Sequence, residues 1–234
     1  MRTFKARGLV LREYEAGESD KRLLLLCKGV GRLFVYARGA RKPRSKFVAA
    51  AQVFSYGDYV IAEGRGFNSL AQASVIEGFY HLRSDYDALC CAHVVAEICE
   101  KAVMAEENCD ELLLLALKAL GYLHKKERPL PALHVLAVFM LRFFLWYGVA
   151  PSLEGEGGLI NAEGLVGGEG AVGETVALSA NGVTALRYIF SSDLARAFLF
   201  SVDASVVREL QNVANMLWRH HFEWALRSLT FIGE

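Results

Sequence analysis

Apolar and polar residues alternate along the first eighty positions, in short segments separated by turns that contain glycine. Such alternation is typical of β-strands, in which successive side chains point to opposite faces of a sheet. Residues 64–68 form a glycine-containing turn, and residues 39–51 form a longer, basic connection. Five short strands with no long helix between them predict a small barrel or sandwich. The five segments are residues 4–14, 21–27, 32–38, 52–62 and 69–79.

From Asp85 onward the apolar residues recur every three or four positions, which indicates helices. The first helix begins near Asp85, and the later ones are predicted over residues 110–122, 133–147, 180–188 and 204–222. Residues 148–173 contain nine glycines, so we expect a loop or a poorly regular hairpin there. The prediction is an α+β chain: a β-domain over residues 1–80, then an all-helical domain over residues 81–234 with a glycine-rich insertion at about 148–176.

The composition excludes several classes of protein. With 53% apolar and 22% charged residues, the chain belongs with ordinary globular proteins rather than disordered ones. Its five cysteines are odd in number and mostly clustered, which favours reduced thiols in a cytoplasmic protein. The first seventeen residues lack the apolar core of a signal peptide. His134 and Arg142 interrupt the most apolar stretch, residues 130–150, so it is interpreted as a buried helix and not a membrane span.

The formal net charge of zero conceals two halves of opposite sign. Residues 1–80 contain fourteen Lys and Arg against seven Asp and Glu, whereas residues 81–234 contain twelve against nineteen. The first part therefore carries +7 and the second −7. This division indicates two bodies with different partners, of which the β-domain suits a polyanion.

The positive charge is concentrated between residues 28 and 46, where seven basic residues occur and no acidic one. Because strand side chains repeat with a period of two, four residues of the third strand share one face, namely Arg32, Phe34, Tyr36 and Arg38. Cations can hold phosphates and rings can stack on bases, so this face predicts binding of single-stranded nucleic acid. The alternative is that the rings cover the core, which would turn Leu33 and Val35 outward. The pattern alone leaves both open.

The loop after the third strand adds charges that can neutralise several phosphates, and binding through it should depend strongly on salt. The candidate DNA-binding residues are Lys21, Arg22, Arg32, Phe34, Tyr36, Arg38, Arg41, Lys42, Arg44, Lys46 and Arg65. The helical domain has one basic cluster, which lies near its most apolar helix and is a candidate receptor for an acidic peptide tail. This cluster consists of Lys125, Lys126 and Arg128.

Several segments, in this order and spacing, resemble the RecO family of DNA repair proteins. They are KARGLVL (5–11), GESDK (17–21), GRLFVYARGARKPRSK (31–46), LAQA (70–73), FYHLRSDY (79–86), FMLR (139–142) and YGVAPSL (147–153). The resemblance covers the first 153 residues, and the closing helices match in general character. It implies an OB-fold barrel of five strands followed by a helical domain, in agreement with the fold expected from the residue pattern.

The resemblance also implies a function without catalytic turnover, in the bacterial cytoplasm and at the nucleoid during repair. RecO proteins bind single- and double-stranded DNA and anneal complementary strands. With the partner RecR they help the RecA recombinase replace single-strand-binding protein on DNA. Many of them contact the acidic C-terminal tail of single-strand-binding protein through the helical domain.

The insertion departs from the family pattern. Many RecO proteins have a four-cysteine zinc site shortly after the Pro-x-Leu that is Pro151–Leu153 here, but this chain has no cysteine after Cys109. The acidic residues present are hard oxygen ligands on a glycine-rich segment, which suits zinc poorly. They are Glu154, Glu156, Glu163 and Glu169. We therefore expect no cofactor and an insertion held by packing alone.

Other motifs carry less weight. The spacing Gly168-x-Gly170-x-x-Gly173 matches a dinucleotide-binding loop, but no buried strand precedes it and Glu169 and Glu174 would repel a pyrophosphate. Cys90 and His93 share a helix face but make an incomplete metal site, so buried small side chains are the expected role of the clustered cysteines. Two other functions remain as alternatives: an RNA-binding factor built on the same barrel, and an enzyme with its site in the insertion, for which no nucleophile or base is apparent.

Overall fold

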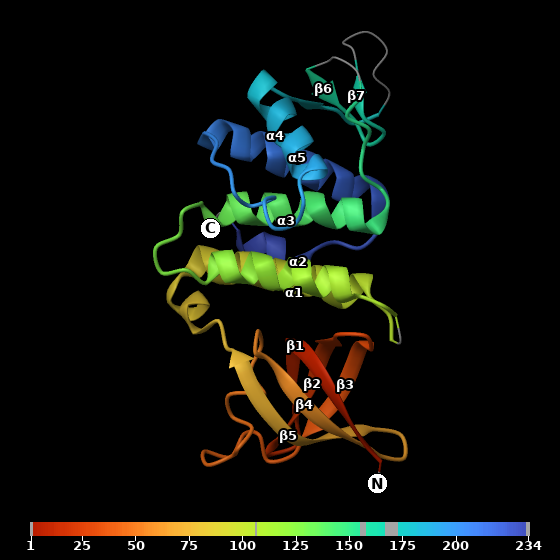
Figure 1. The fold of residues 1–234 in the computed structure, drawn as a ribbon, viewed down its shortest axis with the longest axis vertical. Helices are drawn as coiled ribbons and strands as arrows, with labels where there is room; N and C mark the ends of the chain where they lie inside the picture. The colour runs from red at the N-terminus through yellow and green to blue at the C-terminus, as the bar shows by residue number, and fades with distance from the viewer. Residues whose placement is uncertain (1, 106, 155–157, 167–172, 233–234) are drawn as a thin grey trace. The chain divides into compact units, whose positions relative to one another are not determined.

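The computed structural model describes residues 2–105, 107–154, 158–166 and 173–232. The first part is a closed five-stranded barrel with the strand order β1-β2-β3-β5-β4 (Figure 1). Four neighbouring pairs are antiparallel, and a short parallel pairing between β3 and β5 closes the barrel. The predicted fold class, a five-stranded barrel followed by helices, is therefore confirmed. The strands are β1 (Thr3–Ala16), β2 (Asp20–Cys27), β3 (Gly31–Ala37), β4 (Tyr56–Glu63) and β5 (Asn68–Glu77).

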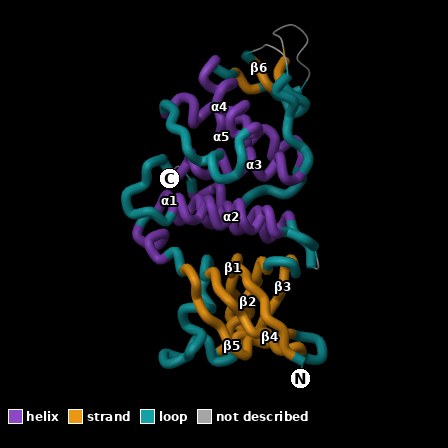
Figure 2. Tube along the Cα trace, viewed as in Figure 1, coloured by secondary structure: helices purple, strands orange, loops and turns teal. Residues whose placement is uncertain are grey.

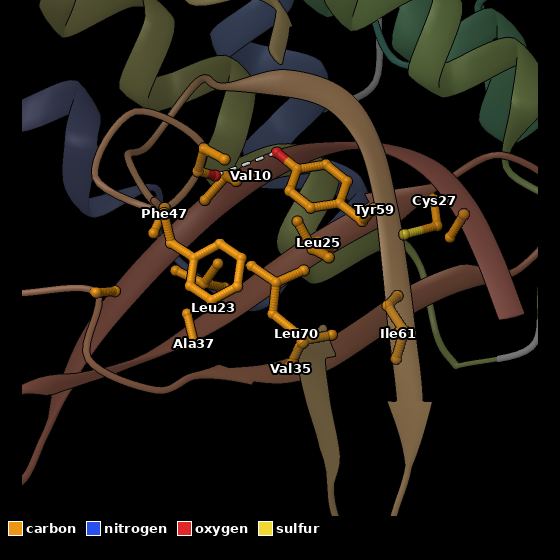
Figure 3. Close-up of a cluster of buried hydrophobic side chains, with 14 residues drawn as sticks. Val10, Leu23, Leu25, Cys27, Val35, Ala37, Phe47, Tyr59, Ile61 and Leu70 are labelled. Carbon is orange, nitrogen blue, oxygen red and sulfur yellow. Dashed lines mark hydrogen bonds between the residues drawn. The ribbon is translucent and has the colours of Figure 1, made fainter. Parts of the chain in front are cut away.

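The barrel core is filled by alternate strand residues and by four residues of the long connection between β3 and β4, Ala40, Phe47, Ala50 and Ala51. Val10, Leu23 and Val35 point inward from three strands, and Figure 3 shows Phe47 packed among such side chains. Ala50 and Ala51 of the same connection join the core. The hydroxyl of Tyr59 donates to the carbonyls of Ala50, at 3.2 Å, and Ser55, at 3.1 Å. The connection is thus anchored in the core, although no strand forms in it (Figure 2).

The start of the fourth strand was predicted wrongly. Residues 52–55 form turns, and β4 begins at Tyr56. Phe54 is buried with φ at 70°, in the left-handed region, and its amide donates to the carbonyl of Val10 at 2.8 Å. The apolar residues here face the interior from a loop, so their spacing resembled that of a strand.

Replacing Phe47 with alanine is expected to lower the free energy of unfolding by about 3 kcal/mol, because a buried ring is lost and a cavity remains. Phe47 is 5% exposed, whereas its neighbour Val48 is 41% exposed. The matched control Val48→Ala should change the stability by less than about 0.5 kcal/mol. Urea unfolding of both variants measures the difference. Equal stabilities would show that the connection is not anchored by this ring.

The helices begin and end close to their predicted positions. A short 3-10 helix, η1 (Tyr80–Ser84), follows the barrel, and a second, η2 (Arg227–Phe231), follows the last α-helix. In the insertion, the structure has a small sheet of three two-residue strands instead of a loop or hairpin, β6 (Leu159–Ile160), β7 (Leu165–Val166) and β8 (Val176–Ala177). The helices are α1 (Tyr86–Ala102), α2 (Asp110–Leu123), α3 (Ala132–Tyr147), α4 (Ala180–Ser191) and α5 (Ala204–His221).

Packing divides the chain into two compact units, which we describe separately. Unit 1 contains the barrel up to Asp85 together with residues 96–124, and unit 2 contains residues 86–95 with the rest of the chain from Lys125. The domain boundary expected at residue 80 stays a prediction.

In unit 1, the last turns of α1 and the helix α2 meet the barrel. The guanidinium of Arg32 donates to the carbonyl of Glu100 at 2.7 Å, and Arg12 forms an ion pair with the Glu100 carboxylate at 2.9 Å. The amide of Gly29 donates to the carboxylate of Asp110 at 2.7 Å. Leu24 and Leu26 belong to the side of β2 that faces away from the barrel core, yet both are fully buried. One end of the outer barrel surface is therefore covered within this unit.

In unit 2, α3 packs against α4 and α5 (Figure 1). Most α3 side chains are buried, as the interpretation of residues 130–150 as a core helix predicts. Arg142 donates to the carbonyls of Ile189, at 2.9 Å, and Ser192, at 2.7 Å, at the end of α4. The carbonyls at this helix end accept hydrogen bonds from the guanidinium of Arg142, so the charged residue that interrupts the apolar stretch has partners in the interior. None of the helices in the described part of the chain is long and apolar enough to cross a membrane.

The insertion is held by polar contacts as well as by packing. The side-chain oxygen of Asn161 accepts from the amides of Glu163, at 3.0 Å, and Gly164, at 2.9 Å. Glu174 forms an ion pair with Arg219 on α5, which lowers the pKa of the Glu174 carboxyl. The expectation of packing alone was therefore too narrow. Glu156, Glu169 and most of the 168–173 glycine motif lie outside the described residues.

The cysteines occupy interior positions. Cys90, Cys91 and Cys99 on α1 are all buried, as expected, and all five cysteines are free thiols. Burial raises the pKa of Cys27 to about 12 and that of Cys109 to about 11. Within the described ranges, no group of three or more His, Cys, Asp or Glu side chains is arranged to hold a metal ion.

Candidate nucleic-acid interface

The strand β3 presents its aromatic and basic residues outward. Val35 and Ala37 belong to the barrel core and are fully buried, whereas Phe34 is 37% exposed and Tyr36 is half-buried. The alternative in which the rings cover the core is therefore wrong. The side chains of Phe34 and Tyr36 are therefore not part of the barrel core.

Strand register extends this face into a row across three strands. Tyr14 on β1 lies opposite Arg22 on β2, and Arg22 lies opposite Tyr36 on β3. Directly opposed residues share one face of a sheet. Because Leu23 and Val35, which are neighbours of this row, point into the core, the row itself faces outward. We call it the aromatic row: Tyr14, Arg22 and Tyr36, with the adjacent Phe34 and Phe67.

Cations lie directly against the rings of the aromatic row. The guanidinium carbon of Arg22 lies 3.9 Å from the centre of the Phe34 ring, within the range of a cation–π contact. The Tyr14 and Phe34 rings have centres 6.4 Å apart. A positive charge and two aromatic rings therefore lie close together in this part of the row.

Phe67 completes the row from the turn between β4 and β5. The parallel pairing of β3 with β5 places Tyr36 opposite Ser69, and the Phe67 ring meets the Tyr36 ring edge-on at 5.6 Å. Phe67 is 45% exposed, and Arg38 lies over it at 5.8 Å. The sequence prediction missed Tyr14 and Phe67. The contact of Phe67 with Tyr36 depends on a pairing between strands about thirty residues apart, and no local pattern reports it.

The basic loop, residues 38–46, follows β3. Its basic side chains are exposed, and hydrogen bonds of its backbone fix its first residues. Arg38, Lys42 and Arg44 are exposed. The amide of Gly39 donates to the Asp20 carboxylate at 2.7 Å, and this hydrogen bond lowers the pKa of Asp20. The backbone amide of Arg41 donates to the carbonyl of Ser19 at 2.9 Å. The backbone of the loop is therefore fixed at Gly39 and Arg41, while the cationic side chains remain exposed.

Other predicted residues are engaged within the protein. Arg32 is bound to the Glu100 carbonyl, as described above. Lys21 is bound to the Glu13 carboxylate, at 2.8 Å, and to the Ala51 carbonyl, at 3.1 Å. Arg41 forms an ion pair with Glu15 at 3.0 Å. Lys46 donates to the Ala71 carbonyl of β5 at 3.1 Å. These four cations stabilise the barrel and its loop, whereas Arg65 is exposed in the same turn as Phe67.

The basic cluster of the helical part lies in unit 2. Lys125 and Lys126 are exposed, and Arg128 is half-buried. A pocket of about 550 Å³ lies between α3, α5 and the C-terminal segment, and it is lined by apolar residues including Leu136, Met140 and Trp218. None of the three basic residues lines this pocket. The structure thus does not bring the cluster and the apolar pocket together.

Comparison with known proteins agrees with the fold. Residues 1–79 match the family model described as Recombination protein O N terminal, and residues 83–230 match Recombination protein O C terminal. A curated protein of Acetivibrio thermocellus, named DNA repair protein RecO, is 28% identical, and the match covers 99% of this chain and 97% of the relative. A protein of the same name from Symbiobacterium thermophilum is 27% identical over the same shares. One from Exiguobacterium sibiricum is 38% identical over 64% of this chain and 59% of the relative.

These matches span both the barrel and the helical part of the chain, in the order that the structure shows. The resemblance in the seven short segments is thereby confirmed over nearly the whole length. The family acts in the repair and recombination of DNA in bacteria, and an outward aromatic and basic barrel surface suits that role. The chain belongs to the RecO family of DNA repair proteins.

Proposed function

We propose that this chain is a recombination mediator that binds single- and double-stranded DNA and anneals complementary strands without catalytic turnover. With RecR, it assists the loading of RecA onto DNA coated with single-strand-binding protein. The observation that carries the proposal is the aromatic row beside the exposed basic loop. Rings accept unpaired bases at about 1–3 kcal/mol per base, and cations neutralise the phosphates. Arg38 and Phe67 combine both kinds of contact at one point.

The annealing step follows from electrostatics. Two DNA strands repel one another through their phosphates, and a protein that releases the counterions of both strands lowers the barrier to pairing. The basic loop supplies exposed cations for this purpose, while the rings hold bases unstacked and available for pairing. Neither role requires a nucleophile, a general base or a bound metal.

Annealing of two complementary oligonucleotides, followed by fluorescence quenching, tests the proposal directly. We expect the protein to accelerate annealing at low salt and to lose this effect as salt rises, because bound phosphates release counterions. Matched RNA oligonucleotides serve as competitors. Acceleration of annealing with DNA but not RNA supports the proposal. Absence of acceleration at every salt concentration contradicts it, and a preference for RNA would favour an RNA-binding role.

The helical part is proposed to recruit the acidic C-terminal tail of single-strand-binding protein. Lys125 and Lys126 are exposed and carry charge opposite to that tail, and Arg128 lies beside them. Anisotropy of a labelled acidic peptide, measured with the protein and with the variant Lys125→Glu, Lys126→Glu, tests this assignment. Equal binding by both proteins would indicate that the tail binds another surface, such as the apolar pocket against α3.

A further inference from the structure

A second cationic surface lies on a part of the barrel remote from the aromatic row. A hollow of about 610 Å³ opens over β1, β4 and β5. The strand register aligns its lining residues in two rows across these strands. One row is Lys5, Val60 and Gln72. The other is Arg7, Asp58 and Ser74. Lys28, just beyond β2, completes the lining. None of the sequence predictions included this surface.

The two surfaces are separated along β1. This strand pairs with β4 over residues 3–9 and with β2 over residues 8–16, so its two halves belong to different sides of the barrel. Lys5 and Tyr14 are nine residues apart, which is about 30 Å along an extended strand. One short oligonucleotide on the aromatic row therefore leaves the hollow accessible.

Arg7 is held in a fixed orientation at the edge of the hollow. Its Nε and Nη2 donate to the two carboxylate oxygens of Asp58 at 2.7 and 3.0 Å. This bidentate bond lowers the pKa of Asp58, and the nearby charge of Lys5 acts in the same direction. A guanidinium has five N–H donors, so donors remain after two are used. Asp58 thus positions a guanidinium fork whose remaining donors are available to a phosphate.

The charges and the lining together favour phosphate over base. Lys5, Arg7 and Lys28 are exposed, and Asp58 is the one carboxylate among the lining residues, which leaves a surplus of positive charge. Gln72 and Ser74 add neutral side chains that can donate to phosphate oxygens. The only aromatic lining residue, Tyr59, is 1% exposed and bonded to backbone carbonyls, so it offers no ring face.

We propose that this hollow is a second phosphate-binding site, which holds the backbone of a second nucleic-acid strand while the first lies on the aromatic row. The inference rests on the proposed binding of nucleic acid and adds where the second strand is held. One small barrel would then hold two strands within about 30 Å and neutralise phosphates on both.

The number of bound oligonucleotides tests the second site independently of annealing. Native mass spectrometry with an oligonucleotide of about four thymidines, the lower end of the site size of one OB fold and too short to span both surfaces, counts the strands on each chain. We expect two per wild-type chain at saturation and one per chain of the variant Lys5→Glu, Lys28→Glu. The matched control Arg196→Glu, Arg208→Glu changes the net charge equally in unit 2 and should retain two.

The outcomes separate this inference from the function on which it rests. A wild-type chain that binds no oligonucleotide contradicts the proposed function itself. One per wild-type chain, or two on the Lys5 and Lys28 variant, overturns the second site. The neutral variant Lys5→Gln, Lys28→Gln should also bind one, and circular dichroism verifies that each variant is folded. If an acidic peptide displaces the second oligonucleotide at equal charge and lower concentration, the site belongs to a peptide instead.

The annealing rate then reports on the role of the site. We expect the Lys5 and Lys28 reversal to slow annealing of complementary oligonucleotides by at least about 10-fold at low salt, because two phosphate contacts to the second strand are lost and repulsion is added. The Arg196 and Arg208 control should anneal at the wild-type rate. Wild-type annealing by the Lys5 and Lys28 variant would show that the hollow does not serve the second strand.

Discussion

Replacing Arg38, Lys42 and Arg44 with glutamate is expected to weaken binding of a single-stranded oligonucleotide by about 500-fold at about 0.05 M salt. Each phosphate neutralised on a single strand contributes about 0.7 to the slope of log K against log salt, so three contacts contribute about 2. At that salt concentration a slope of 2 corresponds to between two and three orders of magnitude. Repulsion from the new carboxylates acts in the same direction.

The salt series distinguishes a lost contact from a damaged fold. The variant should lose affinity and also show a shallower slope, reduced by about 2, because fewer counterions are released on binding. The three side chains are exposed, and the loop keeps its hydrogen bond from Gly39 to Asp20 and its core anchor Phe47. Circular dichroism should therefore be unchanged. An unchanged slope with weaker binding would indicate that these cations do not touch phosphates.

A matched set separates loss of attraction from repulsion. The neutral variant Arg38→Gln, Lys42→Gln, Arg44→Gln removes the contacts without adding carboxylates, so its affinity should lie between wild type and the reversal. The pair Arg196→Glu, Arg208→Glu reverses exposed charges in unit 2 and should bind oligonucleotide within about twofold of wild type. A loss as large as that of the triple reversal would mean that overall charge, and not the loop, governs affinity.

Much of the fold could be predicted from the sequence, because the alternation of strands and the spacing of helices depend on residues that are close together in the chain. The alternation over β3 correctly placed Phe34 and Tyr36 on one face and Val35 and Ala37 on the other, but only the burial in the structure shows that the second face is the core. The helices were found because their apolar residues recur at helical spacing. The start of β4 was missed because Phe54 and its neighbours enter the interior from a turn, where burial follows no period.

The candidate site was only partly predictable, because its geometry depends on contacts between distant strands. Tyr14 joins the aromatic row through the register of β1 with β2, and Phe67 through the closure of β3 on β5. Charge alone also did not distinguish the exposed cations from those that are bonded within the protein. Arg32 and Lys21 have the same charge as Arg38, yet both are bonded within the protein.

Replacing Phe34 and Phe67 with leucine is expected to weaken binding of single-stranded DNA by about 100-fold while changing binding of duplex DNA by less than about threefold. Leucine keeps an apolar side chain but has no ring face, so each substitution removes a stacking contact of about 1–3 kcal/mol. Duplex bases are stacked on one another and do not reach these rings. Fluorescence anisotropy with single-stranded and duplex oligonucleotides of the same sequence measures the two affinities.

The single variants separate stacking from the positioning of cations. Phe34 lies against Arg22 at 3.9 Å and Phe67 lies near Arg38 at 5.8 Å, so each ring also holds a guanidinium in place. Loss of stacking alone leaves the number of phosphate contacts, and hence the salt slope, unchanged for each leucine variant. Loss of a positioned cation lowers that slope as well, and more for Phe34→Leu, whose contact is closer. If both single variants bound single strands as wild type does, the rings would be part of the barrel surface only, and the cations would account for DNA binding by themselves.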